Sequence, residues 1–223
     1  MAKKVSELSA DEFKKTFPII LKEYNTSYKD WYESEKKIIL DAVNAEDVVR
    51  MNHIGSSAVE GVIAKPTIDM LLEIDGCCNV TRLVDALKAI GYGEAIFIRW
   101  DDPMKLLLGK GYSIDGYEEK VFHLHVRYLG NWDELYFRDY LIAHPDVAAE
   151  YGKLKENILS DIESGKIRRI VDGRPNGYSE AKLKFVEKYS KAAKEEFRNC
   201  YSPRAILSPS ADSTGTYCFW QYE

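Results

Sequence analysis

The chain has 223 residues, 45% of them hydrophobic and 30% charged, which supports one folded domain or one domain with a helical extension. A net charge of −5 and an isoelectric point near 5.5 disfavour a general nucleic-acid binder, because such proteins usually carry an excess of basic residues. The four cysteines form no C-x-x-C pair, and no secretory signal or apolar run near the ~20 residues of a membrane span is present. We therefore expect a cytoplasmic protein with reduced thiols and no membrane association.

The first part of the chain mixes helical and strand patterns. Ser9, with Glu12 three positions later, forms a capping box that starts a helix over 9–16. Apolar side chains then recur on one helical face over 31–43. Apolar and β-branched runs next predict two strands, at 48–54 and 67–74.

The second part of the chain changes from strands to helices. Leucine and valine at helical spacing, followed by Gly91, predict a helix over 80–90. Three further strands are predicted at 95–100, 104–108 and 121–128. After Trp132, apolar residues recur at helical spacing and predict three helices, over 135–143, 147–162 and 179–198.

This order predicts an α+β (α/β) fold, a mixed β-sheet flanked by helices with a C-terminal helical layer. We expect a single domain over 1–199, sheet-rich over 45–130 and helical over 131–199. The tail over 200–223 has a linker composition and ends in an aromatic cluster at 217–222. Whether this cluster frays or docks on the domain or on a partner is left open by the sequence.

A Gly-Ser turn followed by a strand that opens on a carboxylate is the most informative pattern. Free backbone N–H groups at Gly55, Ser56 and Ser57 can hold a phosphate, and Asp69 can hold the metal that accompanies it. Taken alone, the turn is better explained as a strand-to-helix connection capped by serine, and Asp69 downstream favours phosphate or anion binding. Lys65 is either a surface lysine or a charge that neutralises the phosphate.

Metal ligands are predicted from residues that share a strand face. Asp69 and Glu73 lie on one face, roughly 13 Å apart, so that both hold one ion only if the strand bulges. His123 and His125 share a face of another strand and reach Asp69 if the two strands are neighbours. Asp69, His123 and His125, with Glu73 added, form the predicted metal site; hydrogen bonding of both histidines to backbone is the alternative.

Basic side chains also gather in the predicted helical part, where a glycine- and proline-bearing loop offers a place for triphosphate contacts. Solvated charge is the more common explanation of such a run. The residues concerned are Arg168, Arg169, Arg174, Lys182 and Lys184.

The chain also resembles a known family, the GrpB family, over about residues 22–190. The segments that carry the resemblance are 53–57, 65–73, 123–126, 137–141 with 143–145, and 178–182 with 185–186. The resemblance implies a nucleotidyltransferase-like fold, in which Gly-Ser is followed by two acids spaced two residues apart. Here Gly55, Ser56 and Asp69 match that pattern, but Leu71 stands where the second acid belongs. Two-metal chemistry needs closely spaced carboxylates, so this departure bears directly on activity.

The predicted function is binding of a nucleotide or another phosphorylated small molecule with a divalent metal, Mg²⁺ or Mn²⁺, or Zn²⁺ if the histidines ligate it. If the protein is active, a nucleotidyl group moves to a small acceptor whose hydroxyl attacks. One alternative is a catalytically inactive nucleotide- and metal-binding module, which Leu71 supports. Another is a metal-dependent phosphohydrolase that uses His123 and His125. Nucleic acid is a disfavoured partner, and assembly into a homo-oligomer is left open.

Overall fold

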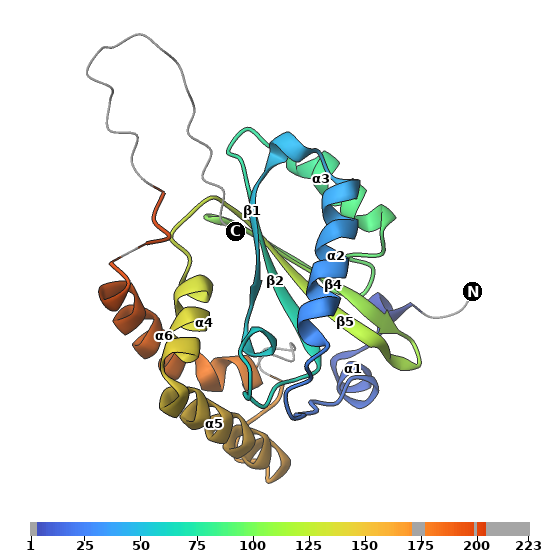
Figure 1. Ribbon diagram of the computed structural model, residues 1–223. Coiled ribbons are helices and arrows are strands. Elements are labelled where there is room, and N and C mark those ends of the chain that lie inside the picture. Colours follow the sequence, from blue (N-terminus) through green and yellow to red (C-terminus); the bar gives the residue numbers. More distant parts are fainter. Residues whose placement is uncertain (1–3, 171–176, 199, 204–223) are drawn as a thin grey trace.

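The computed structural model describes residues 4–170, 177–198 and 200–203. A five-stranded mixed sheet lies at its centre, in the order β1-β2-β5-β4-β3 (Figure 1). Strand β2 runs parallel to β5, and all other neighbours are antiparallel. The predicted mixed sheet with flanking helices is confirmed. The strands are β1 (Val48–Ile54), β2 (Thr67–Ile74), β3 (Phe97–Asp101), β4 (Met104–Ser113) and β5 (Gly116–Tyr128).

Helices cover the sheet on both sides (Figure 1). The helices are α1 (Ala10–Thr16), α2 (Tyr28–Ala42), α3 (Val80–Ala89), α4 (Asp133–Ala143), α5 (Pro145–Glu163) and α6 (Gly177–Glu196). The predicted capping box at the start of α1 is present, with Ser9 and Glu12 bonded reciprocally. Two predicted strands were too short: β4 extends to Ser113, and β5 begins at Gly116, because the two continue as a hairpin beyond their apolar parts. None of the described helices is long and apolar enough to cross a membrane.

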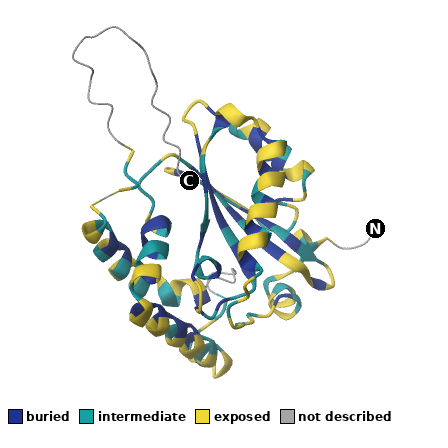
Figure 2. Cartoon of the chain, viewed as in Figure 1, coloured by how far each residue is buried: buried dark blue, intermediate teal, exposed yellow. Residues whose placement is uncertain are grey.

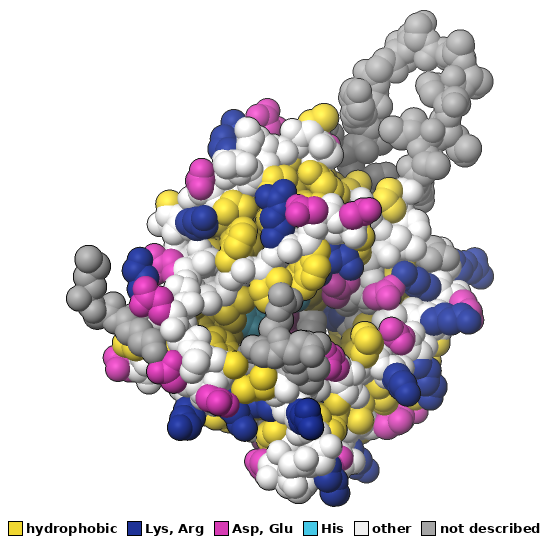
Figure 3. Space-filling view, turned by 180° about the vertical axis from the view of Figure 1, so that it is seen from behind, with side chains coloured by type: hydrophobic (Ala, Val, Ile, Leu, Met, Phe, Trp, Pro, Cys, Tyr) yellow, Lys and Arg dark blue, Asp and Glu magenta, His cyan; other side chains and the backbone are white. Residues whose placement is uncertain are grey.

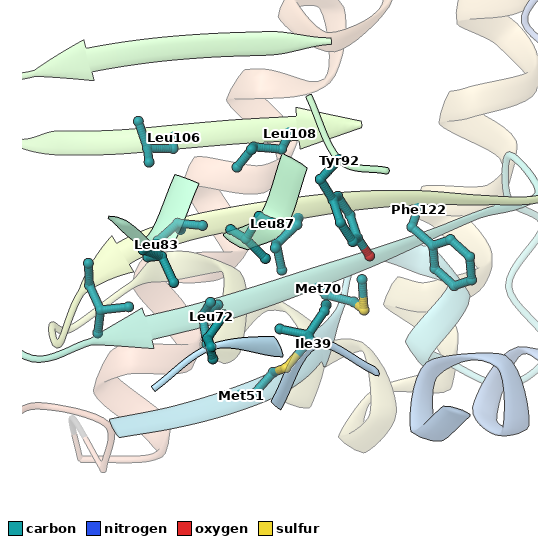
Figure 4. Packing of buried hydrophobic residues seen from close by; sticks show 14 of the residues in the cluster. Ile39, Met51, Met70, Leu72, Leu83, Leu87, Tyr92, Leu106, Leu108 and Phe122 are labelled. Atoms are coloured by element: carbon teal, nitrogen blue, oxygen red, sulfur yellow. The ribbon is translucent and has the colours of Figure 1, made fainter. Parts of the chain in front are cut away.

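The main core lies between one sheet face and helices α2 and α3 (Figure 4). Strand side chains alternate between faces, so Met70, Leu72 and Ile74 of β2 point into this core and are fully buried. Ile39 of α2 and Leu87 of α3 meet them there. Burial of this face explains why the apolar run of β2 was recognisable in the sequence.

The opposite face of β2 is turned toward the C-terminal helices. Two smaller apolar clusters hold these helices in place, and Figure 2 shows their buried sides turned inward. Leu71 packs with Ile54 of β1 and Leu135 of α4 in one of them. Asp69 and Glu73 lie on the same face as Leu71, two residues away on either side. This side of the sheet therefore carries the polar residues that the sequence singled out.

The C-terminal tail is described only at its start. Tyr201 packs beside the small cluster around Leu71, and its hydroxyl lies 2.5 Å from Asp139 Oδ2. Arg138 donates to the same hydroxyl and to the His53 carbonyl oxygen, which joins α4 to the sheet. The aromatic cluster predicted at 217–222 lies outside the described residues.

Candidate functional site

Asp69 and two histidines meet on the face of the sheet opposite the main core. Asp69 pairs with His123 in the parallel register of β2 and β5. Its Oδ1 lies 3.3 Å from His123 Nδ1 and 3.6 Å from His125 Nε2. The side chains are partly accessible, with exposed fractions of 29% for Asp69, 15% for His123 and 22% for His125. The predicted approach of both histidines to Asp69 is therefore observed.

These contacts set the charge of Asp69. Burial alone would raise its pKa, but hydrogen bonds from His123 and His125 hold that pKa well below its ordinary value. Burial lowers the pKa of His123, although Asp69 opposes that shift. At neutral pH the arrangement is therefore a carboxylate in contact with two histidine rings.

The second nitrogen of each histidine also has a partner. His123 Nε2 lies 2.5 Å from the Tyr112 hydroxyl, and His125 Nδ1 lies 3.5 Å from an Arg127 nitrogen. A guanidinium group only donates, so His125 Nδ1 accepts and the hydrogen of a neutral His125 sits on Nε2, facing Asp69. That nitrogen must lose its hydrogen before it can bind a metal ion.

Three lysines from three different segments surround this carboxylate. Lys155 of α5 is buried, and its Nζ donates to Ser56 Oγ at 3.0 Å and to the Ile63 carbonyl oxygen. Lys182 of α6 lies with its Nζ 4.6 Å from the centre of the Tyr178 ring. Lys65, from the loop before β2, has its Nζ 5.8 Å from the same ring. Together with Asp69, His123 and His125, these lysines form what we call the Asp69 cluster.

The three lysines give the described part of the Asp69 cluster an excess of positive charge. Burial and the neighbouring Lys182 lower the pKa of Lys155 to about 7. Burial and Lys65 lower the pKa of Lys182 to about 8. Burial also lowers the pKa of Lys65. The field of Asp69 opposes all three shifts without cancelling them. An added anion would stabilise the charged form of each amine.

The Gly-Ser turn lies directly against Asp69. Gly55 has φ +70°, and a Cβ atom there would lie 2.7 Å from Asp69 Oδ2. Glycine is therefore needed both for its backbone conformation and for the close approach of the carboxylate. Ser56 turns toward Lys155, whereas the buried Ser57 hydroxyl lies 3.0 Å from His53 Nε2. Of the two predicted phosphate-binding serines, the structure places Ser56 at the cluster and Ser57 away from it.

Glu73 is not brought to the cluster. It is fully buried and forms a salt bridge with Arg50, and it also accepts from the Gly130 amide at 3.1 Å. Its oxygens are therefore engaged at the other end of the strand. Leu71, where the second acid was expected, is fully buried between the two carboxylates. No group of three or more His, Cys, Asp or Glu side chains in the described part of the chain is arranged to hold a metal ion.

The predicted basic loop contributes less than expected. Arg169 donates to the backbone oxygens of Lys14 and Phe17, which ties the loop to the N-terminal segment. Arg168 and Lys184 are exposed, and Arg174 lies outside the described residues. Of the five basic residues, Lys182 alone is placed in the Asp69 cluster by the described structure.

Two residues of the site were missed by sequence reasoning. Lys155 follows Tyr151 by four positions and precedes Ile158 by three, so a lysine occupies the apolar face of α5. A lysine on the apolar face of a helix is uncommon, and this position could have singled out Lys155 in the sequence. Tyr178 is buried, and its hydroxyl has no hydrogen-bond partner among the described atoms. A buried polar group without a partner is costly, and a ligand oxygen would satisfy it.

Comparisons with known proteins agree with this geometry at the level of the fold. A family model described as "GrpB protein" matches residues 18–192. The UPF0157 protein YqkA of Bacillus subtilis is 28% identical over 210 residues, which cover 92% of this chain and 56% of YqkA. The glutamate-rich protein GrpB of Alkalihalophilus pseudofirmus is 29% identical over 181 residues, covering 76% of this chain and 92% of that protein. The chain thus matches little more than half the length of YqkA.

A solved structure shows the same fold. The crystal structure of conserved protein GrpB from Enterococcus faecalis superposes with a TM-score of 0.64 and 24% sequence identity. The match covers 80% of this chain and 99% of the other. At this identity the likeness speaks for the architecture alone.

Proposed function

The chain belongs to the GrpB family, and from that premise and the geometry of the Asp69 cluster we propose that it binds the phosphates of a nucleotide or another phosphorylated small molecule. In its active form it would move a nucleotidyl group to a small acceptor. The observation that carries this proposal is that three lysines from three segments lie in the field of Asp69, with two of them over the Tyr178 ring and the third bonded to Ser56.

Charge favours a polyphosphate as the ligand. Among the described residues of the cluster, Lys65 and Lys182, joined by Lys155 when it is protonated, carry up to three positive charges against one negative charge at Asp69. Burial lowers the pKa values of Lys155 and Lys182 first, and repulsion by a neighbouring amine lowers them further. An anion with several charges relieves that repulsion and takes ammonium groups as hydrogen-bond donors.

The neighbouring groups suit the same ligand. Ser56 offers a hydroxyl beside Lys155, and the Tyr178 hydroxyl, which has no hydrogen-bond partner in the described part of the chain, can bond a phosphate oxygen. Lys65 also lines a cavity of about 700 Å³, whose walls include Trp31 and Tyr117. Lys65 is the residue of the Asp69 cluster that lines this cavity, so the cavity adjoins the cluster at Lys65 alone among the described residues.

The proposal includes a divalent metal ion that arrives together with the phosphates of the ligand. Asp69 is the one carboxylate predicted for metal binding that the structure leaves at the cluster, since Glu73 is paired with Arg50. The described side chains therefore do not fit an ion held by the protein alone. They fit Mg²⁺ or Mn²⁺ that arrives with the phosphates and takes Asp69 as a ligand, because Mg²⁺ commonly uses one or two carboxylates with substrate oxygens. A resident Zn²⁺ would need His125 to give up the hydrogen that faces Asp69.

Measurement of turnover distinguishes the two alternative functions from nucleotidyl transfer. An inactive binding module would hold the triphosphate without releasing pyrophosphate, and the apolar Leu71 in place of the second acid favours it. A metal-dependent phosphohydrolase would use metal alone to activate water. Cytoplasmic location and assembly into a homo-oligomer stay predictions.

The first test is a thermal-shift screen with each nucleoside triphosphate, in EDTA or with Mg²⁺, Mn²⁺ or Zn²⁺. A triphosphate at 100 times its dissociation constant should stabilise the protein by about 2.7 kcal/mol. Lys182→Met should lose most of this shift. The matched control is Lys184→Met, because Lys184 lies two residues further along α6 and is exposed.

The outcomes are distinct. Asp69→Asn should lose the additional shift that Mg²⁺ or Mn²⁺ gives in the presence of triphosphate. Metal alone should give no shift in the wild type. If no triphosphate stabilises the wild type, or if both lysine variants lose the shift equally, the proposed phosphate site is wrong. Pyrophosphate release, measured on the nucleotide that binds, then separates the enzyme from the binding module.

A further inference from the structure

Ser56 and Lys155 form a hydrogen-bonded pair that phosphate binding alone does not require. The two residues are far apart in sequence, and the Lys155 amine lies 3.0 Å from Ser56 Oγ. Lys155 is 2% exposed, so water screens it little. Ser56 is half-buried, in the turn that also contacts Asp69. A serine hydroxyl in contact with a buried amine is the arrangement of a nucleophile and its base.

The contacts of Lys155 suit a neutral amine. The Ile63 carbonyl oxygen accepts one N–H of Lys155, and the charged amine also donates to Ser56 Oγ at 3.0 Å. Once the amine is neutral, its lone pair can accept the Ser56 hydroxyl hydrogen at the same contact. In the ligand-free protein, burial and the nearby Lys182 also lower the pKa of Lys155 to about 7, so a large share of this amine is neutral at cellular pH before an anion binds. The Tyr151 ring lies 4.6 Å from Lys155 Nζ and covers one side of the amine.

We propose that Ser56 is a nucleophile activated by Lys155, and that nucleotidyl transfer passes through a covalent Ser56 phosphodiester. This inference rests on the proposed function for its substrate class, a nucleoside triphosphate. It assigns Ser56 a bond to phosphorus, where a phosphate-binding serine would make a hydrogen bond only.

The first step forms the bond from Ser56 Oγ to the α-phosphorus and breaks the bond from that phosphorus to the bridging oxygen. Pyrophosphate leaves with the electron pair, and the hydroxyl proton passes to Lys155. In the second step the acceptor oxygen bonds to the phosphorus and its own proton goes to water. Ser56 Oγ then leaves and takes back the proton held by Lys155. Lys65 and Lys182 offset the charge of the departing pyrophosphate.

The test that does not depend on the nucleotide is labelling with a fluorophosphonate. Ser56 Oγ would bond to the phosphorus, fluoride would leave, and Lys155 would take the proton. We expect an adduct on Ser56 by peptide mass spectrometry, with a rate that rises as pH increases through about 7. Lys155→Arg keeps a positive charge but removes the base, and it should slow labelling by about 100-fold. Ser56→Ala should abolish the adduct.

A neighbouring serine supplies the matched control. Ser57→Ala should label like the wild type, because the Ser57 hydroxyl faces His53. Melting temperatures of all variants exclude loss of fold as the cause of a slow rate, and the pH profile of the wild type needs no variant. The proposal is overturned if the wild type gives no Ser56 adduct, or if Lys155→Arg labels as fast as the wild type.

A second arm uses the four nucleoside triphosphates themselves, without an acceptor. The expected product is a wild-type chain heavier by one nucleoside monophosphate on Ser56, with one pyrophosphate released. A triphosphate thermal shift without any Ser56 adduct would leave the proposed function standing and overturn this inference. Fluorophosphonate labelling without a triphosphate shift or adduct would overturn the nucleotide part and keep the reactive pair.

Discussion

Two carboxylates on one face of β2 have opposite surroundings. Glu73 is fully buried, and its oxygens accept from Arg50 and from the Gly130 amide, so its charge is matched. Asp69, four residues earlier, contacts two histidines and lies near three lysines that are not paired with it. Leu71 separates the two in an apolar cluster.

The difference separates a stabilising ion pair from a site. Around Glu73 every charge has a partner, which is what a buried ion pair needs to be tolerated. Around Asp69 the positive charges exceed the negative ones, and Tyr178 carries a buried hydroxyl without a partner among the described atoms. Such an imbalance is expected where a ligand completes the arrangement.

The largest expected effect comes from breaking the ion pair between Glu73 and Arg50. Glu73→Gln removes the charge that pairs with Arg50, which is 20% exposed. We expect a loss of about 3 kcal/mol in the free energy of unfolding, measured with urea, because one partner of a buried pair is left alone. Triphosphate affinity of the folded variant should stay near the wild-type value. A loss below about 1 kcal/mol would contradict the stabilising role of the pair, and a selective loss of affinity would mean that Glu73 belongs to the site.

A smaller effect tests the crowding at Asp69. Gly55→Ala places a methyl group 2.7 Å from Asp69 Oδ2 at a positive φ. Gly61→Ala is the matched control, because Gly61 has φ +77° and no atom within 4 Å of the added Cβ. Both variants should lose about 1 kcal/mol from backbone strain. Gly55→Ala alone should lose more stability than that and bind triphosphate at least about tenfold more weakly, by calorimetry. Equal behaviour of the two variants would exclude close approach as the role of Gly55.

The smallest expected effect is a pH dependence of stability and of triphosphate affinity, caused by the lysines near Asp69. The lysine pKa values are lowered in the folded protein, so the unfolded chain binds more protons above pH 7. Stability of the ligand-free protein from these groups therefore rises as pH increases from about 7 to 9. Triphosphate affinity should fall over the same range, because the amines lose the charge that the anion needs.

The same lysines predict that binding takes up protons near pH 8. Calorimetry in two buffers of different ionisation enthalpy measures this uptake directly. Lys182→Met should reduce it, since Lys182 titrates near that pH. Binding without proton uptake would mean that the amines are already charged in the free protein.

Sequence patterns were most informative where one physical requirement acted alone. The apolar run of β2 predicts a strand because the side chains facing α2 and α3 must be buried. The turn at Gly55 and the strand opening on Asp69 were recognisable for a similar reason, since positive φ and a lone acid in an apolar run are uncommon. The approach of the histidines to Asp69 followed once β2 and β5 were neighbours.

The sequence was least informative where a residue's role depends on a distant segment. Glu73 has the same residue class and strand face as a metal ligand, and only the position of Arg50 on β1 makes it an ion-pair partner. Ser57 and Ser56 are adjacent and chemically alike, yet one meets His53 and the other meets Lys155. Local pattern carries no information on these partners.

The sequence by itself determined the alternation of elements, the mixed sheet and the segment that presents Asp69. Tertiary structure decided which charges gather around it. Lys65, Lys155 and Lys182 come from a loop and two helices, and packing of α5 and α6 against α4 and the loop after β1 brings their amines together. The physical reason is that hydrophobic periodicity is a local property of the chain, whereas electrostatic fields sum over every neighbour in space.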